Sequence, residues 1–216
     1  NADLVIVAIP SGRIPALGDA VRASLPPGAI LVDVGNYYPD RDGHIAELDQ
    51  GTPESKWVSN QLGRPVVKAL NNIMADQLAT AARTKESPDR VALPVAADDD
   101  RARSVVMALV EELGFDAFDA GSLDASWRQQ PGQPAYCSNP TRKELPPLLE
   151  RADRDKAPVS RDKGLRLMSR LPPDFPSDRL VKIARLSAGL DLWRPANWFA
   201  ALALAAALIS GKSNAR

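Results

Sequence analysis

Cysteine and histidine are almost absent from this sequence of 216 residues, which has one of each, and aromatic residues make up only 5% of it. Cys137 alone can form neither an internal disulfide nor a cysteine-based metal cluster, and such cysteine usage is typical of a reducing compartment. No zinc-ligand spacing, Gly-x-Ser-x-Gly turn or phosphate-binding loop is present. We therefore expect a cytoplasmic protein, with no motif for a metal centre or a serine nucleophile.

A Gly-x-Gly pair is also missing from the whole sequence. Dinucleotide-binding folds normally carry Gly-x-Gly-x-x-Gly after their first strand, where the glycines let the backbone approach a pyrophosphate. Motif evidence alone therefore gives little support to nucleotide binding, and the case for it must rest on the fold pattern.

The charged residues balance overall but are divided along the chain. Residues 1–140 hold 12 basic and 19 acidic side chains, a net charge of −7, and residues 141–216 hold 15 and 8, a net charge of +7. A basic tail can contact phosphate, a membrane surface or nucleic acid. We favour the simpler interpretation, in which a solvated basic face packs beside an acidic body and no nucleic acid is bound. The boundary between a globular domain and a helical tail is placed at about residue 140.

One complete strand–helix–strand unit spans Arg90–Leu123. Apolar residues alternate in Val91–Val95, Asp98–Asp100 supply carboxylates at a helix start, and Val105–Leu113 repeats apolar residues at helical spacing. A glycine and then a second short strand, Phe115–Ala120, follow. Tight connections between a capped helix and two strands are typical of α/β proteins.

Three continuous apolar runs precede this unit: Leu4–Ile9, Ala29–Val34 and Pro65–Leu70. Unbroken hydrophobic runs are typical of strands that are covered on both faces, as in a parallel sheet. Helix-compatible segments separate them, including Glu54–Leu62. Five strands separated mostly by helices predict an α/β protein with a doubly wound parallel sheet.

Ligands of doubly wound sheets lie at the carboxyl ends of the strands. In this sequence those ends are four loops: Ile9-Pro10-Ser11, Gly35-Asn36-Tyr37, Asn71–Ala75 and Ala96–Asp98. Geometry alone therefore makes these loops the candidate site. Asn71 and Asn72 could hydrogen-bond a ligand there, and a polar turn explains them equally well.

Other reactive or aromatic side chains have simpler explanations. His44 has no evident orienting partner for base catalysis, and Cys137 has no histidine nearby, so we expect neither to be catalytic. The Asp98–Asp100 run could ligate a divalent cation, but carboxylates at a helix start more often cap the helix. Trp127 and Tyr136 could stack on a ring, although packing of a loop onto the body accounts for them as well.

Residues 198–209, WFAALALAAALI, are apolar on every face. As a helix they would rise roughly 18 Å, which is short of the ~30 Å core of a bilayer. We therefore expect a buried helix or a dimer interface rather than a membrane span.

Four stretches taken together resemble one family: Asp3–Pro10 (DLVIVAIP), Arg64–Ile73 (RPVVKALNNI), Val91–Phe115 and Asp119–Leu123 (DAGSL). Their order and spacing are similar to those of NADP-dependent oxidoreductases that act with the 8-hydroxy-5-deazaflavin coenzyme F-420. The nucleotide-binding domain of STEAP-type ferric reductases is similar as well. The resemblance covers about residues 1–140, and the tail after residue 141 does not share it.

The resemblance implies a Rossmann domain with NADP as cofactor, and we expect the protein to act as a homodimer. It places six residues at the cofactor: Ile9, Pro10, Ser11, Asn36, Asn71 and Ala75. The first three would line the ribose and nicotinamide, Asn36 lies where the backbone touches the nicotinamide, and the last two belong to the loop at the carboxamide. The Gly-rich turn of such domains would precede the first strand here by roughly sixty residues, so we expect this chain to lack that half of the domain.

Three hypotheses stay open. The first is hydride transfer between NADPH and a deazaflavin or flavin acceptor, in which the cofactors carry the chemistry and the protein orients them. No protein nucleophile or essential metal is then needed. The second is a nicotinamide-linked reductase of another small substrate, such as an imine. The third is a non-catalytic NADP-binding module whose basic tail touches a membrane.

Overall fold

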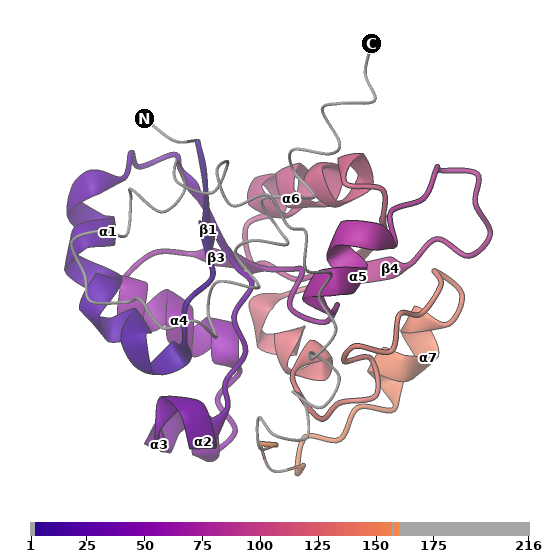
Figure 1. Ribbon diagram of the computed structural model, residues 1–216. Coiled ribbons are helices and arrows are strands. Elements are labelled where there is room, and N and C mark those ends of the chain that lie inside the picture. The colour runs from indigo at the N-terminus through magenta and orange to yellow at the C-terminus, as the bar shows by residue number, and fades with distance from the viewer. Residues whose placement is uncertain (1–2, 157, 160–216) are drawn as a thin grey trace, which may run out of the picture.

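The computed structural model describes residues 3–156 and 158–159, and Figure 1 shows their arrangement. All five predicted strands are present: β1 (Leu4–Val7), β2 (Ile30–Asp33), β3 (Val66–Lys68), β4 (Ala92–Val95) and β5 (Asp116–Asp119). The apolar segment at 198–209 and most of the predicted basic tail lie outside the described residues.

The strands form two parallel groups. β1, β2 and β3 pair in that order, with Leu4 opposite Ile30 and Leu31 opposite Val66, and β4 pairs in parallel with β5. An isolated antiparallel bridge between Lys68 and Ala96 links the two groups. The predicted α/β class with a Rossmann-like arrangement of parallel strands is confirmed, and the antiparallel link is a detail that the sequence pattern did not indicate.

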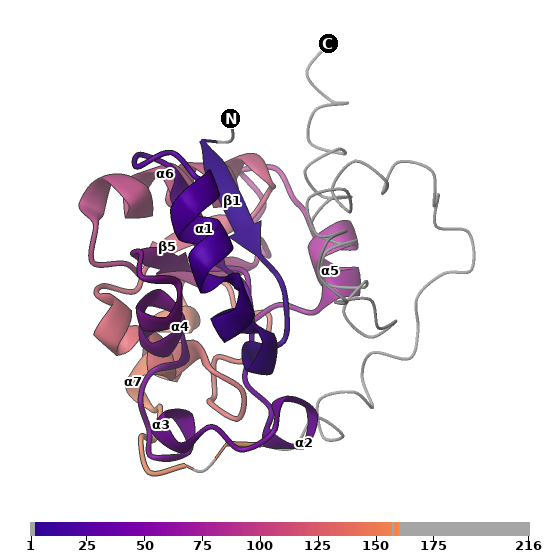
Figure 2. The same cartoon turned by 90° about the vertical axis from the view of Figure 1, so that its left-hand side faces the viewer.

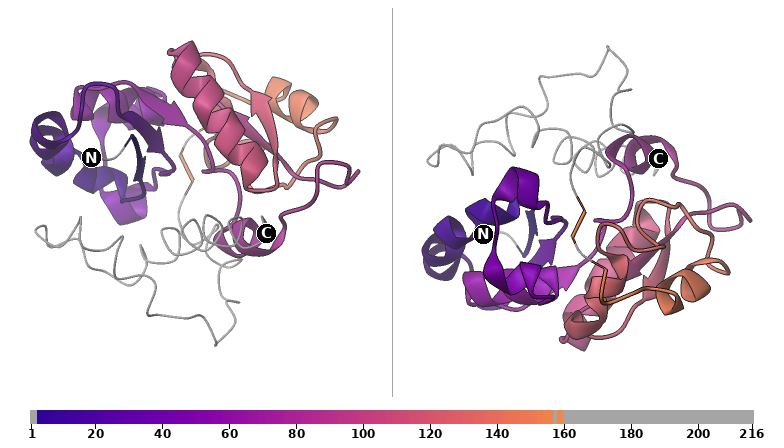
Figure 3. Two further views of the ribbon diagram at one scale, coloured as in Figure 1. Left: turned by 90° about the horizontal axis from the view of Figure 1, so that it is seen from above. Right: turned by 90° about the horizontal axis from the view of Figure 1, so that it is seen from below.

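Helical segments separate the strands along the chain. The connections before β4 are η1 (Ser11–Leu17), α1 (Gly18–Ser24), α2 (Pro39–Asp42), α3 (Ala46–Asp49), α4 (Glu54–Leu62) and α5 (Ala75–Thr80). The later ones are α6 (Asp100–Glu112), η2 (Leu123–Gln129) and α7 (Leu145–Glu150). α1 lies beside β1 (Figure 2), and the half of the chain with β1–β3 lies beside the half with α6 and α7 (Figure 3).

The carboxylates at the start of α6 cap it, as expected. The Asp99 side chain accepts a hydrogen bond from the Ala102 backbone N–H at 2.8 Å, which satisfies one of the free donors of the first turn. At the other end, Gly114 takes a φ of +90°, a left-handed conformation that glycine adopts without strain. Both ends of this helix therefore follow from local sequence.

Prolines shape the beginning of two helical segments. The segment after β1 begins as the 3-10 helix η1, which contains Pro15. Proline removes a backbone donor, so a regular α-helix starts only at Gly18. Pro146 and Pro147 lie in the first turn of α7, where the missing N–H is tolerated.

The sheet is covered on both faces, which explains the unbroken apolar runs of its strands. Val32 and Val67 pack into one cluster with residues of β4, β5 and α6, whereas their neighbours Leu31 and Val66 pack into a second cluster with η1 and α4. Successive side chains of a strand point to opposite faces, so both faces of β2 and β3 need apolar residues.

The first turns of the predicted tail pack onto the body. Leu145 and Leu149 of α7 form a small cluster with Ala92 and Ala135, and Thr141 forms an antiparallel bridge with Val91. Within the described part of the chain, no helix is both long and apolar enough to span a membrane.

Phe115 provides a test of the core beneath α6. Its side chain is completely buried, so Phe115→Ala leaves a cavity and should lower the free energy of unfolding by about 3–5 kcal/mol in urea denaturation. Val105, which is 40% exposed on α6, gives the control, and Val105→Ala should change that free energy by less than about 0.5 kcal/mol. Equal losses in the two variants would contradict this core.

Candidate functional site

The loops that follow β1, β2 and β3 meet at one edge of the sheet. The carbonyl oxygen of Ile9 lies 3.6 Å from where a Cβ on Gly35 would stand. Asn36 Nδ2 donates a hydrogen bond to the backbone oxygen of Asn71 (3.0 Å), and Asn71 Nδ2 donates one to Asn36 Oδ1 (3.1 Å). The fourth loop joins them through backbone hydrogen bonds between Ala96 and Lys68.

Asn71 and Asn72 differ sharply in their surroundings. Asn71 is 3% exposed, and its Nδ2 also donates to the backbone oxygen of Gln129 (2.8 Å), while its Oδ1 accepts from Gln129 Nε2 (3.2 Å). Asn72 is 1% exposed, and neither polar atom of its side chain has a partner. The Asn71 side chain therefore joins the loops to one another. The Asn72 side chain, in contrast, has a buried donor and a buried acceptor without hydrogen-bond partners.

The other predicted cofactor residues line the same edge or begin its helices. Ile9 and Pro10 are half-buried, Ser11 is buried as the first residue of η1, and Ala75 is the half-buried first residue of α5. Backbone groups of these residues, with the side-chain amides of Asn36 and Asn71, are of the kind that hydrogen-bond a carboxamide or a hydroxyl. The sequence has no Gly-x-Gly turn of the kind that binds a pyrophosphate.

A buried charge cluster beneath this edge was not anticipated. Lys68 is completely buried, Asp33 is 2% exposed and Glu54 is 8% exposed. Lys68 Nζ donates to Asp33 Oδ2 (3.2 Å) and lies 3.7 Å from Glu54 Oε2, too far for a hydrogen bond. Asp33 also accepts hydrogen bonds from Ser55 Oγ (2.6 Å) and the Gly35 N–H (2.9 Å). One ammonium thus faces two carboxylates.

Burial raises the pKa of the Glu54 carboxyl from 4.5 to about 7. The Lys68 ammonium acts in the opposite direction, and the Asp33 carboxylate raises the pKa further. The Asp33 carboxylate accepts three hydrogen bonds, one of them from the Lys68 ammonium, whereas Glu54 Oε2 accepts none. Hydrogen bonding in the cluster therefore stabilises chiefly the charge of Asp33. Glu54 is therefore the carboxyl of the cluster that changes protonation near neutral pH.

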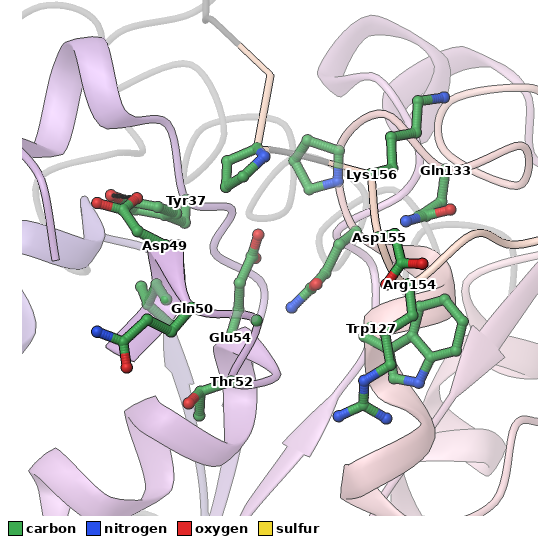
Figure 4. A pocket seen from close by; sticks show the side chains of 15 residues that line it. Tyr37, Asp49, Gln50, Thr52, Glu54, Trp127, Gln133, Arg154, Asp155 and Lys156 are labelled. Atoms are coloured by element: carbon green, nitrogen blue, oxygen red, sulfur yellow. Dashed lines mark hydrogen bonds between the residues drawn. The ribbon is translucent and has the colours of Figure 1, made fainter. Parts of the chain in front are cut away.

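Glu54 also lines a cavity of about 340 Å³. Residues between Tyr37 and Glu54 form one wall, and the other is formed by residues between Trp127 and Gln133 together with residues 154–156 and 158. Figure 4 shows the Glu54 carboxyl pointing into the space between Tyr37 on one side and Trp127 on the other. Glu54 Oε2 and Gln130 Nε2 are both buried and have no hydrogen-bond partner. Both residues line the cavity, so its lining includes a carboxyl oxygen and an amide N–H group without partners.

The wall opposite Glu54 carries an aromatic ring between cations. The guanidinium groups of Arg128 and Arg154 lie 4.8 Å and 5.6 Å from the ring centre of Trp127. Arg154 and Lys156 line the cavity together with Asp155. Trp127 is half-buried at this wall. The predicted ring-stacking role of Trp127 stays a prediction, since an arriving ring would share its surface with these cations.

Cys137 and His44 show little sign of reactivity. Burial raises the pKa of the Cys137 thiol to about 11, so the nucleophilic thiolate is rare at neutral pH. His44 Nδ1 does have a partner, Asp49 Oδ2 at 3.0 Å, but the histidine side chain is 85% exposed. Tyr136, the other predicted ring partner, instead shares a hydrogen bond with the hydroxyl of Tyr38 at 2.5 Å.

Comparison with known proteins relates the chain to a bacterial protein of similar fold. No family model matches the chain. The hypothetical protein SMa0349 of Sinorhizobium meliloti is 30% identical, with 66% of this chain and 68% of that chain covered and a TM-score of 0.55. The fold and its strand-end loops define a Rossmann-like α/β protein. The chain belongs to the same family as SMa0349.

Two further proteins are similar to this chain over a smaller share of its length. Protein YjhV of Escherichia coli is 49% identical over 51 residues, which is 24% of this chain and 37% of that protein. A protein of an Arthrobacter species, whose name proposes an F-420-dependent NADP reductase, is 25% identical over 59% of each chain, with a TM-score of 0.46.

The pKa of Glu54 predicts a pH-dependent stability. Between about pH 4.5 and 7 the folded protein keeps a proton that the unfolded chain has lost, so stability falls as the pH rises through this window. The free energy of unfolding of the wild type should fall, relative to Glu54→Gln, by on the order of 3 kcal/mol between pH 4.5 and pH 8.

Urea unfolding of both proteins across this pH range measures the difference. Comparison with Glu54→Gln removes the contributions of all other titrating groups. Parallel stability curves for the two proteins would contradict the assigned pKa, whereas a growing advantage of the glutamine variant above pH 5 would agree with it.

Proposed function

We propose that this protein is a nicotinamide-linked oxidoreductase, in which the edge formed by the loops after β1, β2 and β3 holds the nicotinamide of NADPH. The single observation that carries the proposal is the reciprocal hydrogen-bonding of Asn36 and Asn71, which joins two predicted cofactor loops at the carboxyl edge of a parallel sheet. The sequence resemblance to deazaflavin-linked NADP oxidoreductases over residues 1–140 supports the same assignment.

The acceptor is proposed to be a deazaflavin or flavin ring. The cavity beside Glu54 is of the size usual for small-molecule sites, and Trp127 lines it. When bound, the nicotinamide supplies a hydride, and the protein orients the two rings and excludes water between them. An imine acceptor is the second candidate, because the half-protonated carboxyl of Glu54 suits a substrate nitrogen.

The remaining proposals concern the cellular location, the oligomeric state and the partners of the protein. We propose a cytoplasmic homodimer that takes a small-molecule redox acceptor and binds no nucleic acid. The single cysteine supports the cytoplasmic assignment, because such cysteine usage is typical of a reducing compartment.

Saturation-transfer NMR with NADPH tests the cofactor assignment. Because this chain carries residues for the nicotinamide end, the nicotinamide and adjoining ribose protons should receive more saturation than the adenine protons. Asn36→Ala removes the side chain that ties the loop after β2 to Asn71, and should reduce this transfer several-fold. Asn60→Ala, at an exposed position of α4, is the control and should leave it unchanged.

The distribution of transferred saturation between the adenine and nicotinamide rings decides whether the cofactor assignment is correct. Equal saturation of adenine and nicotinamide that persists in Asn36→Ala would mean non-specific contact, and the proposal would be wrong. The absence of transfer to either ring would have the same meaning. Circular dichroism confirms that each variant is folded before the comparison is made.

A second test concerns protein nucleophiles and bases. Removing a true catalytic acid or base typically lowers kcat by 10²–10⁴-fold. Because the cofactors carry the chemistry, His44→Ala and Cys137→Ala should each keep kcat within about threefold of the wild type. NADPH oxidation with 8-hydroxy-5-deazariboflavin measures this. Loss of most of kcat in either folded variant would contradict a purely orienting role of the protein at these positions.

A further inference from the structure

Glu54 is a buried acid that lines a cavity, and one of its carboxyl oxygens accepts no hydrogen bond. It begins α4, and its Oε2 atom is buried with no hydrogen-bond donor. The nearest cation, Lys68 Nζ, lies 3.7 Å from Oε2. It donates hydrogen bonds to Asp33 Oδ2 and to the Gly35 carbonyl oxygen instead. A buried polar atom without a partner is destabilising, so its presence at a cavity points to a ligand.

The same cluster reaches the proposed nicotinamide edge. Lys68 Nζ donates to the Gly35 carbonyl oxygen at 2.5 Å, and Gly35 directly precedes Asn36. Glu54, on the other side of this ammonium, faces the cavity. A ring bound in the cavity would therefore have Glu54 on one side and the loop of Asn36 close by.

We propose that Glu54 is the proton donor to the acceptor bound in this cavity, and that the acceptor is a planar heteroaromatic ring that takes up a proton on a ring nitrogen when it is reduced. The inference rests on the proposed function. It assigns Glu54 a catalytic role that hydride transfer alone does not require, and it makes Gln130 Nε2 a second, neutral donor to the same ring.

The reaction balances with these groups. The C–H bond of the reduced nicotinamide breaks with its electron pair, a new bond from hydrogen to the ring forms, and the nicotinamide is oxidised as the ring is reduced. The O–H bond of Glu54 breaks, and its proton joins the ring nitrogen. The carboxylate that is left faces the Lys68 ammonium and regains a proton from water through the cavity.

Several charged groups face Glu54 from the elements around it. Lys68 on β3 and Asp33 on β2 are the nearest, and Arg41 on α2 adds a positive charge. A backbone hydrogen bond from Tyr37 also favours the carboxylate.

The charges of the cavity wall complete the surroundings of Glu54. Asp49 lies on one side, and Arg154, Asp155 and Lys156 lie on the other. The pKa of Glu54 in these surroundings is about 7, which gives both the acid and its carboxylate at neutral pH.

Riboflavin is the probe for this site, because its ring is planar, uncharged around neutral pH and rich in nitrogen acceptors. We expect the full chain to bind riboflavin about 10-fold more tightly at pH 5.5 than at pH 8, since only the protonated carboxyl donates a hydrogen bond. Quenching of riboflavin fluorescence measures the affinity. In weakly buffered solution at pH 8, binding should also take up a proton.

Three variants separate the role of Glu54 from structural effects. Glu54→Gln keeps an N–H donor, so it should bind tightly at both pH values and take up no proton. Glu54→Ala should bind weakly at both. Glu112→Gln, the same change at an exposed position of α6 outside the cavity lining, should keep the pH dependence of the wild type.

Three results would overturn the inference: no saturable binding, equal affinity of the wild type at both pH values, or an unchanged pH dependence in Glu54→Gln. The NADPH experiment stands apart from this one because it uses no ring acceptor. Nicotinamide saturation without pH-linked riboflavin binding would remove the role of Glu54 alone. The reverse result would remove the cofactor assignment and leave Glu54 as a donor to a bound ring.

Discussion

The completely buried ammonium of Lys68 is the constraint on which the site depends. A charge withdrawn from water needs opposite charge and hydrogen-bond acceptors close by, and here they come from three different segments. Asp33 ends β2, Glu54 begins α4, and the Gly35 carbonyl belongs to the loop between them. Satisfying Lys68 therefore fixes the end of β2, the start of α4 and the loop of Asn36 at once.

This arrangement divides the two carboxylates by role. Asp33 accepts hydrogen bonds from Ser55, Gly35 and Lys68, and so it is the hydrogen-bonded partner of the ammonium. Glu54 has the same ammonium at a longer distance and no donor on Oε2. A buried carboxyl that lines a cavity and has a raised pKa is typical of sites that move protons. Stability gains little from such a cluster, because a buried ion pair often contributes less than apolar packing would.

The fold could be predicted much further than the site. The strands and α6 follow from local pattern, since Val32 and Leu31 pack on opposite faces of the sheet and Asp99 caps its own helix. The pairing of Asn36 with Asn71 follows from topology, because ends of neighbouring parallel strands meet. The cavity could not be predicted, since residues of distant segments line it, among them Trp127 of η2, Arg154 and Pro158. One signal was available: a lysine inside the apolar run Pro65–Leu70 requires a buried acid, and Glu54 was assigned only to a helix start.

The shared ammonium also couples the two parts of the proposed site. Lys68 Nζ holds the Gly35 carbonyl at 2.5 Å and lies 3.7 Å from Glu54 Oε2. While Glu54 keeps its proton, the ammonium has Asp33 as its only full counter-charge within the cluster. Loss of that proton places a second negative charge beside the ammonium, which also holds the Gly35 carbonyl directly before Asn36. One buried cation therefore lies between the cavity that Glu54 lines and the loop that Asn36 and Asn71 tie together.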